Sequence, residues 1–274
     1  MQIIYVYGMA RSGTSAMTRL LSLCGLDLAE ELIAPDTRIN PSGFWEPKLA
    51  LTLNERFLKA QHSDWHDPSF RIQEAGAISE KASENFIQEI VTFLTGQQHL
   101  SRLVIKEPRI VLLAKFWQEA SRRLNATSNY VITIRNPAEV IESLGEGFAL
   151  SPKISASLWL KSTLLAERAT RMLPRVIVDY KNLMHDWFIE IDRVKSALSL
   201  NLDVSKKTEI EQFLDQKLYR QRRPPIYDGI FWNQEIRQAY DILHKAAEGG
   251  SIDMEGLDHI YNSFKHDIKL ENFN

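Results

Sequence analysis

Short apolar runs alternate with longer stretches of helical periodicity along the first 180 residues of the chain. Runs rich in β-branched and aromatic residues predict buried strands at residues 3–7, 102–106, 130–134 and 176–179. Apolar residues that recur every three or four positions predict helices at residues 14–24, 48–61, 79–94, 111–124 and 155–172. Strands that alternate with helices form a parallel sheet covered by helices on both faces. The pattern therefore predicts a three-layer α/β fold.

Proline residues mark the limits of several predicted elements. Pro137 suits the first turn of a helix after the third strand, and Pro174 ends the long helix before the fourth strand. After about residue 182 the pattern is mainly helical, with a turn-rich interruption at residues 222–225. The chain has no internal repeat and no low-complexity segment. We therefore expect residues 1–274 to form a single domain with a helical C-terminal part.

The composition changes this picture little. Apolar residues make up 44% and charged residues 25% of the 274 residues, and the net charge is −2. No global positive field attracts nucleic acid or an anionic membrane, so any anion site must be local. No stretch of 18 apolar residues predicts a membrane span. The N-terminus lacks the segments of a secretion signal, and Cys24, the single cysteine, excludes an internal disulfide. We expect a cytoplasmic protein in which Cys24 is a buried helix residue.

A glycine-containing loop joins the first predicted strand to the first predicted helix. In residues 8–15, GMARSGTS, both glycines and the final hydroxyl match the phosphate-binding pattern G-x-x-x-x-G-K-[ST]. Thr14 stands where that pattern has its lysine, and Arg11 is the only cation in the loop. Backbone N–H groups and the helix N-terminus still provide a cradle for an anion. These residues predict a P-loop NTPase-like fold whose loop does not hold a phosphate chain in the usual way.

A second anion-binding pattern follows the third predicted strand. Residues 130–143 read as a strand, an arginine turn and a helix, so Arg135 lies at the carboxyl edge of the sheet, where α/β proteins bind ligands. Ser143 follows eight residues later, about two helical turns along. The alternative is an arginine that forms a surface ion pair at the start of a helix. If the pattern binds an anion, Arg135 must lie close to the loop at residues 8–15.

The run YVYGMARSGTSAMTRLL resembles the 5′-phosphosulfate loop of sulfotransferases that use 3′-phosphoadenosine 5′-phosphosulfate (PAPS), which reads P-K-S-G-T-T-W or P-R-S-G-T in different members. The resemblance implies that Arg11 stabilises the transferring sulfuryl group. It also implies 5′-phosphate contacts from Ser12, Gly13, Thr14 and Ser15. Ala16 replaces the family's adenine-stacking tryptophan, so adenine must be held in another way here.

Later segments extend the resemblance to this superfamily. Its 3′-phosphate signature is a strand, then R-[ND]-P and a serine at a fixed offset, which Arg135 and Ser143 match. Tyr180, in VIVDYKNL, matches a tyrosine that contacts the nucleotide. Trp159 matches a recurrent tryptophan that we interpret as a core residue. The joint occurrence of these motifs, in order, is more specific than any one of them.

The residues for sulfuryl transfer follow less directly. Lys106 matches a lysine of K-[ST]-H-L-P that touches the sulfate in cytosolic relatives, but Pro108 replaces the histidine that acts as their base. Carboxylates serve as the base in several other members, and Glu46, in NPSGFWE, lies in a comparable loop. The alternative role for Glu46 is that of an acid favoured by the dipole at the start of a helix. The other candidate bases are Glu107, Glu31 and Glu30.

Two further clusters carry weaker interpretations. His62 and His66 lie near two aspartates, Asp64 and Asp67, but the sequence there favours a turn, so we expect no metal site. A basic cluster near the C-terminal part is either a solvated helix face or a segment that closes over a 3′-phosphate: Arg220, Arg222 and Arg223.

The resemblance implies a sulfotransferase that moves a sulfuryl group from PAPS to an acceptor hydroxyl, by in-line transfer with a carboxylate base. It favours a carbohydrate or glycolipid acceptor. One alternative is a P-loop nucleotide kinase or NTPase, which needs a lysine at position 14 and an aspartate for magnesium, such as Asp179. The other alternative is a nucleotide-binding domain without catalysis.

Overall fold

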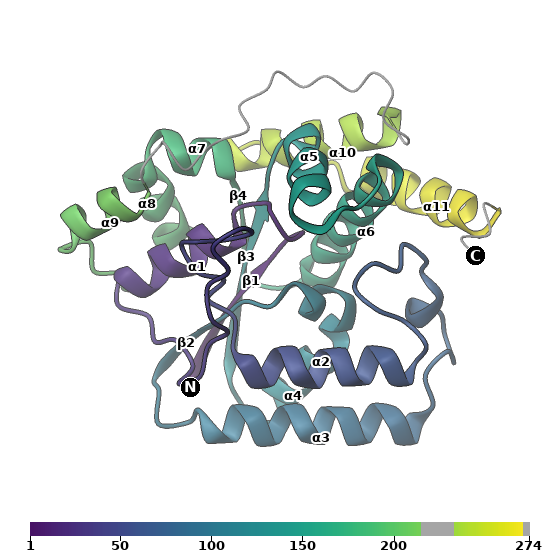
Figure 1. Cartoon of the computed structure of the whole chain (residues 1–274). Helices are drawn as coiled ribbons and strands as arrows, with labels where there is room; N and C mark the ends of the chain where they lie inside the picture. Colours follow the sequence, from purple (N-terminus) through teal and green to yellow (C-terminus); the bar gives the residue numbers. More distant parts are fainter. Residues whose placement is uncertain (215–232, 271–274) are drawn as a thin grey trace.

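Four parallel strands form the centre of the computed structural model, which describes residues 1–214 and 233–270 (Figure 1). Within these residues the sheet order is β2-β1-β3-β4, and every pairing is parallel. The strands are β1 Gln2–Tyr7, β2 Arg102–Ile105, β3 Thr127–Ile134 and β4 Arg175–Asp179. Helices cover both faces of this sheet. The predicted three-layer α/β fold is confirmed.

The alternation of side chains along β1 explains why its sequence is apolar throughout. Ile4 and Val6 enter one apolar cluster, whereas Ile3, Tyr5 and Tyr7 enter the cluster on the opposite face. Helices pack on both sides of the sheet, so both faces of β1 are buried, while β2 and β3 pair with its two edges. This central position places the carboxyl end of β1, and the loop that follows it, in the middle of one sheet edge.

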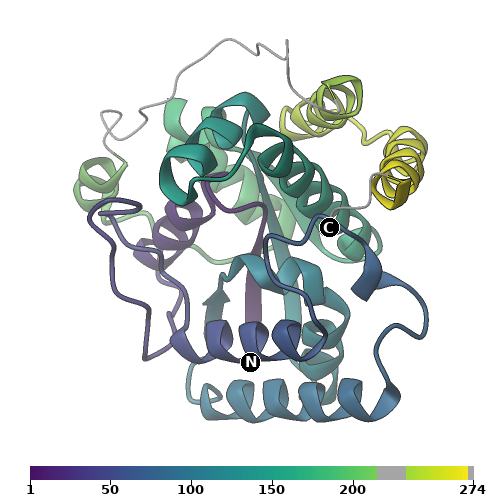
Figure 2. The same ribbon diagram turned by 45° about the vertical axis from the view of Figure 1, so that its right-hand side comes forward.

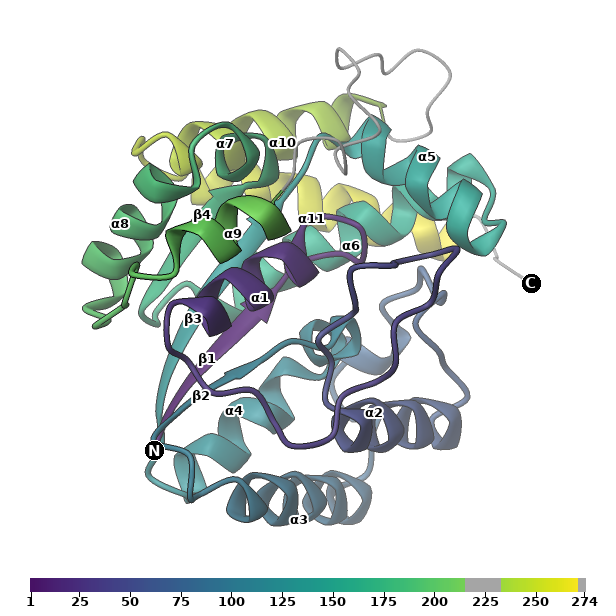
Figure 3. The ribbon, with the colours of Figure 1, turned by 60° about the vertical axis from the view of Figure 1, so that its left-hand side comes forward.

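Each face of the sheet has its own set of helices (Figure 3). The smaller apolar cluster lies beneath α1 Thr14–Leu23, α7 Tyr180–His185, α8 Trp187–Leu198 and α9 Lys207–Phe213. The larger cluster lies beneath α2 Lys48–Ala60, η1 Arg71–Gln73, α3 Glu80–Gly96, η2 Pro108–Leu113, α4 Ala114–Arg123, α5 Pro137–Phe148, α6 Pro152–Thr170, α10 Asn233–Ala247 and α11 Met254–Leu270. The last two pack beside α6 (Figure 2).

Side-chain caps fix the starts of helices where the sequence predicted them. The Ser79 hydroxyl accepts a hydrogen bond from the Ala82 N–H, 3.2 Å away, at the start of α3. The Asn136 side chain accepts one from the Ala138 N–H, 3.0 Å away, and Pro137 occupies the first helical position of α5. The predicted opening of a helix at Pro137 is confirmed, and it places this helix directly after Arg135.

Several predicted boundaries are displaced by interactions that a local pattern does not reveal. The helix predicted at residues 111–124 begins earlier, as the 3₁₀ helix η2, because the Glu107 carboxylate accepts a hydrogen bond from the Arg109 N–H. Strand β3 begins at Thr127 instead of Tyr130, since its polar first residues still pair with β1 from Gln2 onward. Lys106 lies one residue beyond β2 rather than within it.

Two expectations about the core are also met. Cys24 is fully buried at the C-terminal end of α1, and burial raises the pKa of its thiol to about 11. Trp159 is fully buried in the larger apolar cluster. In the described parts of the chain, no helix is both long and apolar enough to cross a bilayer.

Candidate functional site

The loop between β1 and α1 depends on two glycines. Gly8 and Gly13 have φ angles of 143° and 88°, which side-chain-bearing residues rarely adopt. A Cβ atom added at Gly8 would lie 2.5 Å from the Thr133 carbonyl oxygen. One added at Gly13 would lie 2.3 Å from Cδ2 of Tyr180. The backbone can therefore follow this tight path, close to β3 and α7, only with glycine at both positions.

The start of α1 presents its backbone to the cavity beside this loop. Gly13 precedes the helix in a left-handed conformation, and no side chain of the described residues caps the first turn. The first turn also contains no acidic residue. The first N–H groups of a helix have no partner within it and carry partial positive charge. This end of α1 therefore suits an anionic group.

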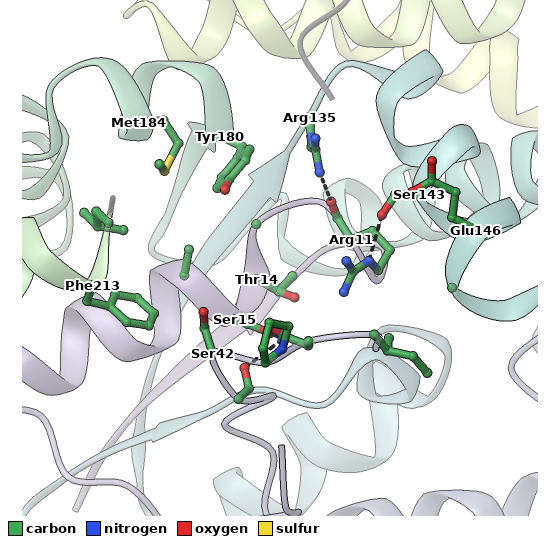
Figure 4. Close-up of a pocket in the computed structure, with 18 of the residues that line it drawn as sticks. Arg11, Thr14, Ser15, Ser42, Arg135, Ser143, Glu146, Tyr180, Met184 and Phe213 are labelled. Atoms are coloured by element: carbon green, nitrogen blue, oxygen red, sulfur yellow. Dashed lines mark hydrogen bonds between the residues drawn. The ribbon is translucent and has the colours of Figure 1, made fainter. Parts of the chain in front are cut away.

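Arg135 joins the two predicted anion-binding motifs. Its Nη1 donates a hydrogen bond to the carbonyl oxygen of Arg11, 3.1 Å away (Figure 4). Its Nε donates one to the Glu139 carboxylate, 2.8 Å away. The Nε of Arg11 donates in turn to the Ser143 hydroxyl, 2.9 Å away. Arg135 is buried, with an exposed fraction of 7%. The predicted approach of Arg135 to the loop is therefore observed, and the arginine is not a surface residue.

Tyr180, which directly follows β4, contacts the loop at residues 8–15. It is the first residue of α7, and its ring packs against Gly13. The guanidinium carbon of Arg135 lies 5.0 Å from the centre of the same ring, which is within the range of a cation–π contact. Burial raises the pKa of the Tyr180 hydroxyl, although Arg135 and Arg11 act in the opposite direction. Tyr180 thus contacts both motifs at once.

Lys106 and Glu46 form a buried ion pair next to the loop. Their exposed fractions are 3% and 5%. The Nζ of Lys106 also donates hydrogen bonds to the Ser15 hydroxyl, 3.2 Å away, and to the Phe44 carbonyl oxygen, 3.1 Å away. Glu46 therefore points inward to Lys106 and does not have the outward orientation of a helix-start acid. Neither side chain is among those that line the cavity described below.

The carboxylate of Glu107, the second candidate base, is occupied by interactions with Asn54 and Arg109. Its carboxylate accepts hydrogen bonds from the Asn54 side chain, 2.6 Å away, and from the Arg109 N–H, 3.1 Å away, and it forms an ion pair with the Arg109 guanidinium. Burial raises the pKa of Glu107 to about 7, while Arg109 favours the charged form. Glu31 is exposed, and the exposed carboxylate of Glu30 lies 3.3 Å from Nε2 of His99. None of the four acids lines the cavity, and Glu46 differs from the other three in its ion pair with Lys106 beside the loop.

A cavity of about 200 Å³ lies along the loop and the start of α1. At one end it is lined by polar side chains, among them Arg11, Arg135, Ser143 and Glu146 (Figure 4). Met184 and Phe213 lie at the other end (Figure 4), and Ala16 and Leu214 add further apolar lining. The Tyr180 ring also lines the cavity, next to Arg135. The segment at residues 38–43 forms one side. The cavity therefore offers an anionic ligand one charged end and one end suited to a flat apolar group.

Sequence reasoning missed several residues of this cavity. Asn40 donates hydrogen bonds to the Ser15 hydroxyl, 3.2 Å away, and to the Gly43 carbonyl oxygen, 2.7 Å away, so it fastens residues 38–43 to the loop. The Asn-Pro pair at position 40 signalled a turn but not this contact. Met184 and Phe213 have no local signal, because only the packing of α7 and α9 beside α1 brings them to the cavity.

The remaining candidates lie elsewhere. Asp67 accepts a hydrogen bond from the Ser63 hydroxyl, 2.7 Å away, and His66 lies 3.8 Å from Asp64. Nowhere in residues 1–214 or 233–270 do three or more His, Cys, Asp or Glu side chains form a group able to hold a metal ion. Asp179 caps α7. The basic cluster lies outside the described residues: Arg220, Arg222 and Arg223.

Comparison with known proteins finds matches among solved structures alone. No protein-family model matches the sequence, and no curated protein is similar to it. Among solved structures, the chain is similar to the sulfotransferase domain from the Synechococcus PCC 7002 olefin synthase. The two share 15% sequence identity, with 96% of this chain and 94% of that chain covered and a TM-score of 0.48. A likeness of this degree carries no argument about function.

Proposed function

We propose that this protein is a sulfotransferase that uses PAPS as its donor, with residues 1–274 as one sulfotransferase domain. The observation that carries the proposal is the hydrogen bond from Arg135 to the carbonyl oxygen of Arg11. It brings two motifs that lie roughly 120 residues apart, each suited to one anionic group, to the edge of a single cavity. A nucleotide with two separate anionic groups matches this arrangement.

The charged end of the cavity fits the two anionic groups of PAPS. The backbone N–H groups of Gly13, Thr14 and Ser15, which line the cavity at the start of α1, would hold the 5′-phosphosulfate. Ser12, the other residue that the resemblance implies, does not line the cavity, and its N–H donates to the Met9 carbonyl oxygen. Arg135 and Ser143 would hold the 3′-phosphate. Arginine forms charge-assisted hydrogen bonds to phosphate, and the buried position of Arg135 strengthens such bonds.

The apolar end of the cavity fits the adenine. Ala16 lacks the ring that stacks on adenine in relatives of this superfamily, but Phe213 and Met184 line the same end of the cavity. The Phe213 ring is held by an edge contact to Trp45, with 6.3 Å between ring centres. An aromatic ring and a thioether are suitable partners for the flat face of a base. We therefore assign the adenine to Phe213 and Met184.

Sulfuryl transfer needs cations that stabilise the negative charge developing in the transition state. It also needs a base that takes the proton of the acceptor hydroxyl. PAPS supplies an activated sulfuryl group on its 5′-phosphate. We assign the cationic roles to Arg11 and Lys106, and the role of base to Glu46. Lys106 and Glu46 neutralise each other in their buried pair, which avoids the cost of burying either charge alone. The contact of Lys106 with Ser15 joins this pair to the loop.

The chief alternative is a P-loop kinase or NTPase. Thr14 is buried at the position of the lysine that such a protein uses to reach the β- and γ-phosphates. Asp179, which sequence alone places like a magnesium-binding aspartate, receives hydrogen bonds from Lys181, Tyr240 and His244. A non-catalytic nucleotide-binding domain would not need Lys106 and Glu46 beside the loop. These observations favour a sulfotransferase.

Ligand-induced thermal shift tests this proposal. Adenosine 3′,5′-bisphosphate (PAP), the product of PAPS, should stabilise the protein, whereas ATP with magnesium should do little. At a PAP concentration of 100 times Kd, binding adds about 2.7 kcal/mol to the free energy of unfolding. A larger shift with ATP and magnesium than with PAP would favour the kinase or NTPase. The acceptor, which we propose to be a hydroxyl of a carbohydrate or glycolipid, would then be sought with labelled PAPS.

A further inference from the structure

Asp179 is a fully buried carboxylate at the carboxyl end of β4, and residues from two helices converge on it. Its Oδ1 accepts a hydrogen bond from the Lys181 N–H, 2.9 Å away, and so caps α7. Its Oδ2 accepts one from the Tyr240 hydroxyl, 2.8 Å away, and lies 2.8 Å from Nδ1 of His244. A carboxylate can only accept, so Nδ1 carries a proton. Asp179 thus ties α10 to the first turn of α7.

The surroundings of His244 favour the imidazolium form. Its Nε2 lies 3.4 Å from the carboxylate of Glu248, while its Nδ1 faces Asp179. Nδ1 carries a proton toward Asp179, and a second proton on Nε2 gives the imidazolium, whose charge is attracted to both carboxylates. The Tyr240 ring stacks on the histidine ring, with 5.5 Å between centres and 15° between planes. Two carboxylates and a parallel aromatic ring are a suitable environment for a cation.

The first turn of α7 is also part of the candidate nucleotide site. Tyr180 immediately follows Asp179, and its ring packs on Gly13 and beneath the Arg135 guanidinium. In the sheet, Asp179 pairs with Ile134, the residue before Arg135. Any movement of the Asp179 carboxylate therefore acts on the backbone that carries Tyr180. No described residue that lines the cavity belongs to α10.

We propose that His244, in its protonated form and together with Tyr240, is a positioning residue for the nucleotide site: it holds Asp179, and through it Tyr180, against the phosphate loop. This proposal rests on the proposed function, which supplies PAP or PAPS as the ligand of the site. It goes beyond that function in assigning a role to α10, which does not contact the cavity.

The inference has a definite dependence on pH. The hydrogen bond to Asp179 raises the pKa of His244, with smaller contributions from the charges of Asp179 and Glu248, whereas burial and Lys181 lower it. The titratable groups beside the ring are Asp179 of β4, Lys181 of α7, Tyr240 of α10 and Glu248, which directly follows α10. Because the pKa is raised, the stabilisation that protonated His244 gives through Asp179 is fully present below the ordinary pKa of about 6.5. It is lost as the pH rises through the folded-state pKa.

Calorimetric titration of PAP at pH 6.0 and pH 8.5 tests the inference, with His244→Asn and Tyr240→Phe as variants. Asparagine keeps one N–H donor but cannot carry the charge. We expect wild-type protein to bind PAP about 5- to 30-fold more tightly than His244→Asn at pH 6.0, and nearly equally at pH 8.5. The ratio of the wild-type affinity to the His244→Asn affinity is taken at each pH, because the titration of the PAP phosphates affects both proteins equally and cancels in this ratio. The Tyr240→Phe variant should show a smaller loss at both values.

The control variants separate positioning from general stability. His259→Asn changes an exposed histidine of α11 and should bind PAP like the wild type at both pH values. In a Tyr180→Ala background, His244→Asn should no longer change the PAP affinity, because the coupling passes through Tyr180. A wild-type to His244→Asn ratio that is the same at both pH values would overturn the inference. So would an His244 pKa, followed by NMR, that does not rise when PAP binds, since the coupling must be reciprocal.

The proposed function and this inference can fail separately. If the wild type bound no PAP at either pH, the function would be wrong, but the loop could still be examined without nucleotide. The amides of Ser12 and Met17 donate hydrogen bonds to the carbonyls of Met9 and Gly13. Their hydrogen exchange at pH 6.0 should be faster in His244→Asn than in the wild type. Equal exchange rates would overturn the positioning role even if PAP binds.

Discussion

The ring of Tyr180 packs so closely on Gly13 that a Cβ atom added to this glycine would lie 2.3 Å from Cδ2 of the tyrosine. The contact joins the loop at residues 8–15 to the start of α7, although Gly13 and Tyr180 are 167 positions apart in the chain. Gly13 is therefore required for two reasons: its φ of 88° and the space that the tyrosine occupies. These two requirements can be separated by experiment.

Gly13→Ala should lower the free energy of unfolding by roughly 2–4 kcal/mol, through a left-handed backbone and a clash with the Tyr180 ring. Gly76→Ala is the matched control, because Gly76 has a similar φ of 75° and no atom within 4 Å of the added Cβ. That change should cost only about 1 kcal/mol. Urea denaturation measures both values. Equal losses for the two variants would show that the Tyr180 contact is unimportant.

Phe213→Ala should weaken PAP binding by removing the aromatic surface at the apolar end of the cavity. Stacking of a base on an aromatic ring contributes roughly 1–3 kcal/mol, which corresponds to a 5- to 150-fold change in Kd. Calorimetry with PAP and with an abasic ribose 3′,5′-bisphosphate measures the contribution of the base. The variant should bind the abasic compound as well as the wild type does. Equal weakening for both ligands would place the adenine elsewhere.

Glu46→Gln should lower kcat roughly 10²–10⁴-fold while leaving PAP affinity nearly unchanged, since the amide cannot accept the acceptor proton. Turnover would be followed with labelled PAPS and an acceptor found by screening. The change also leaves Lys106 without its buried counter-charge, so the variant should be less stable. The unfolding of both proteins is therefore measured as well, and their turnover is compared at a temperature at which both are folded.

Glu107→Gln provides the comparison for Glu46. Glu107 caps η2 and holds Arg109 and Asn54, so its substitution should disturb the turn after Lys106 and weaken donor binding. If Glu46→Gln kept wild-type turnover while Glu107→Gln abolished turnover without loss of PAP affinity, the roles of the two acids would be reversed.

Local sequence patterns were sufficient for the four strands and for the glycine-containing turn at residues 8–15. A β-branched strand that ends at a glycine-containing loop and a helix is encoded within about 25 consecutive residues, so the arrangement of Gly8 and Gly13 could be predicted. The same holds for Arg135 at the end of β3 and Pro137 at the start of α5. In each case the residue takes its position from the strand or helix that it adjoins.

Contacts between distant segments could not be predicted in this way. Glu46 and Lys106 are 60 positions apart, and nothing in either segment indicates that they form a buried pair. Phe213 reaches the cavity only because α9 packs beside α1. Asp179 was compared with a magnesium-binding aspartate because its partners on α10, Tyr240 and His244, lie more than 60 positions away. The tertiary packing determines what these side chains contact.

Calorimetric titration of Arg135→Ala with PAP and with adenosine 5′-monophosphate tests most directly whether the two motifs form one PAPS site. Loss of a charge-assisted contact to the 3′-phosphate should cost roughly 1.5–3 kcal/mol, or about 10- to 150-fold in the Kd of PAP, with little change for the monophosphate. Arg175→Ala is the control, because Arg175 also pairs with a buried glutamate but lies at the opposite end of the sheet. It should change neither affinity. Equal weakening of both ligands by Arg135→Ala, or wild-type protein that does not bind PAP, would contradict the account.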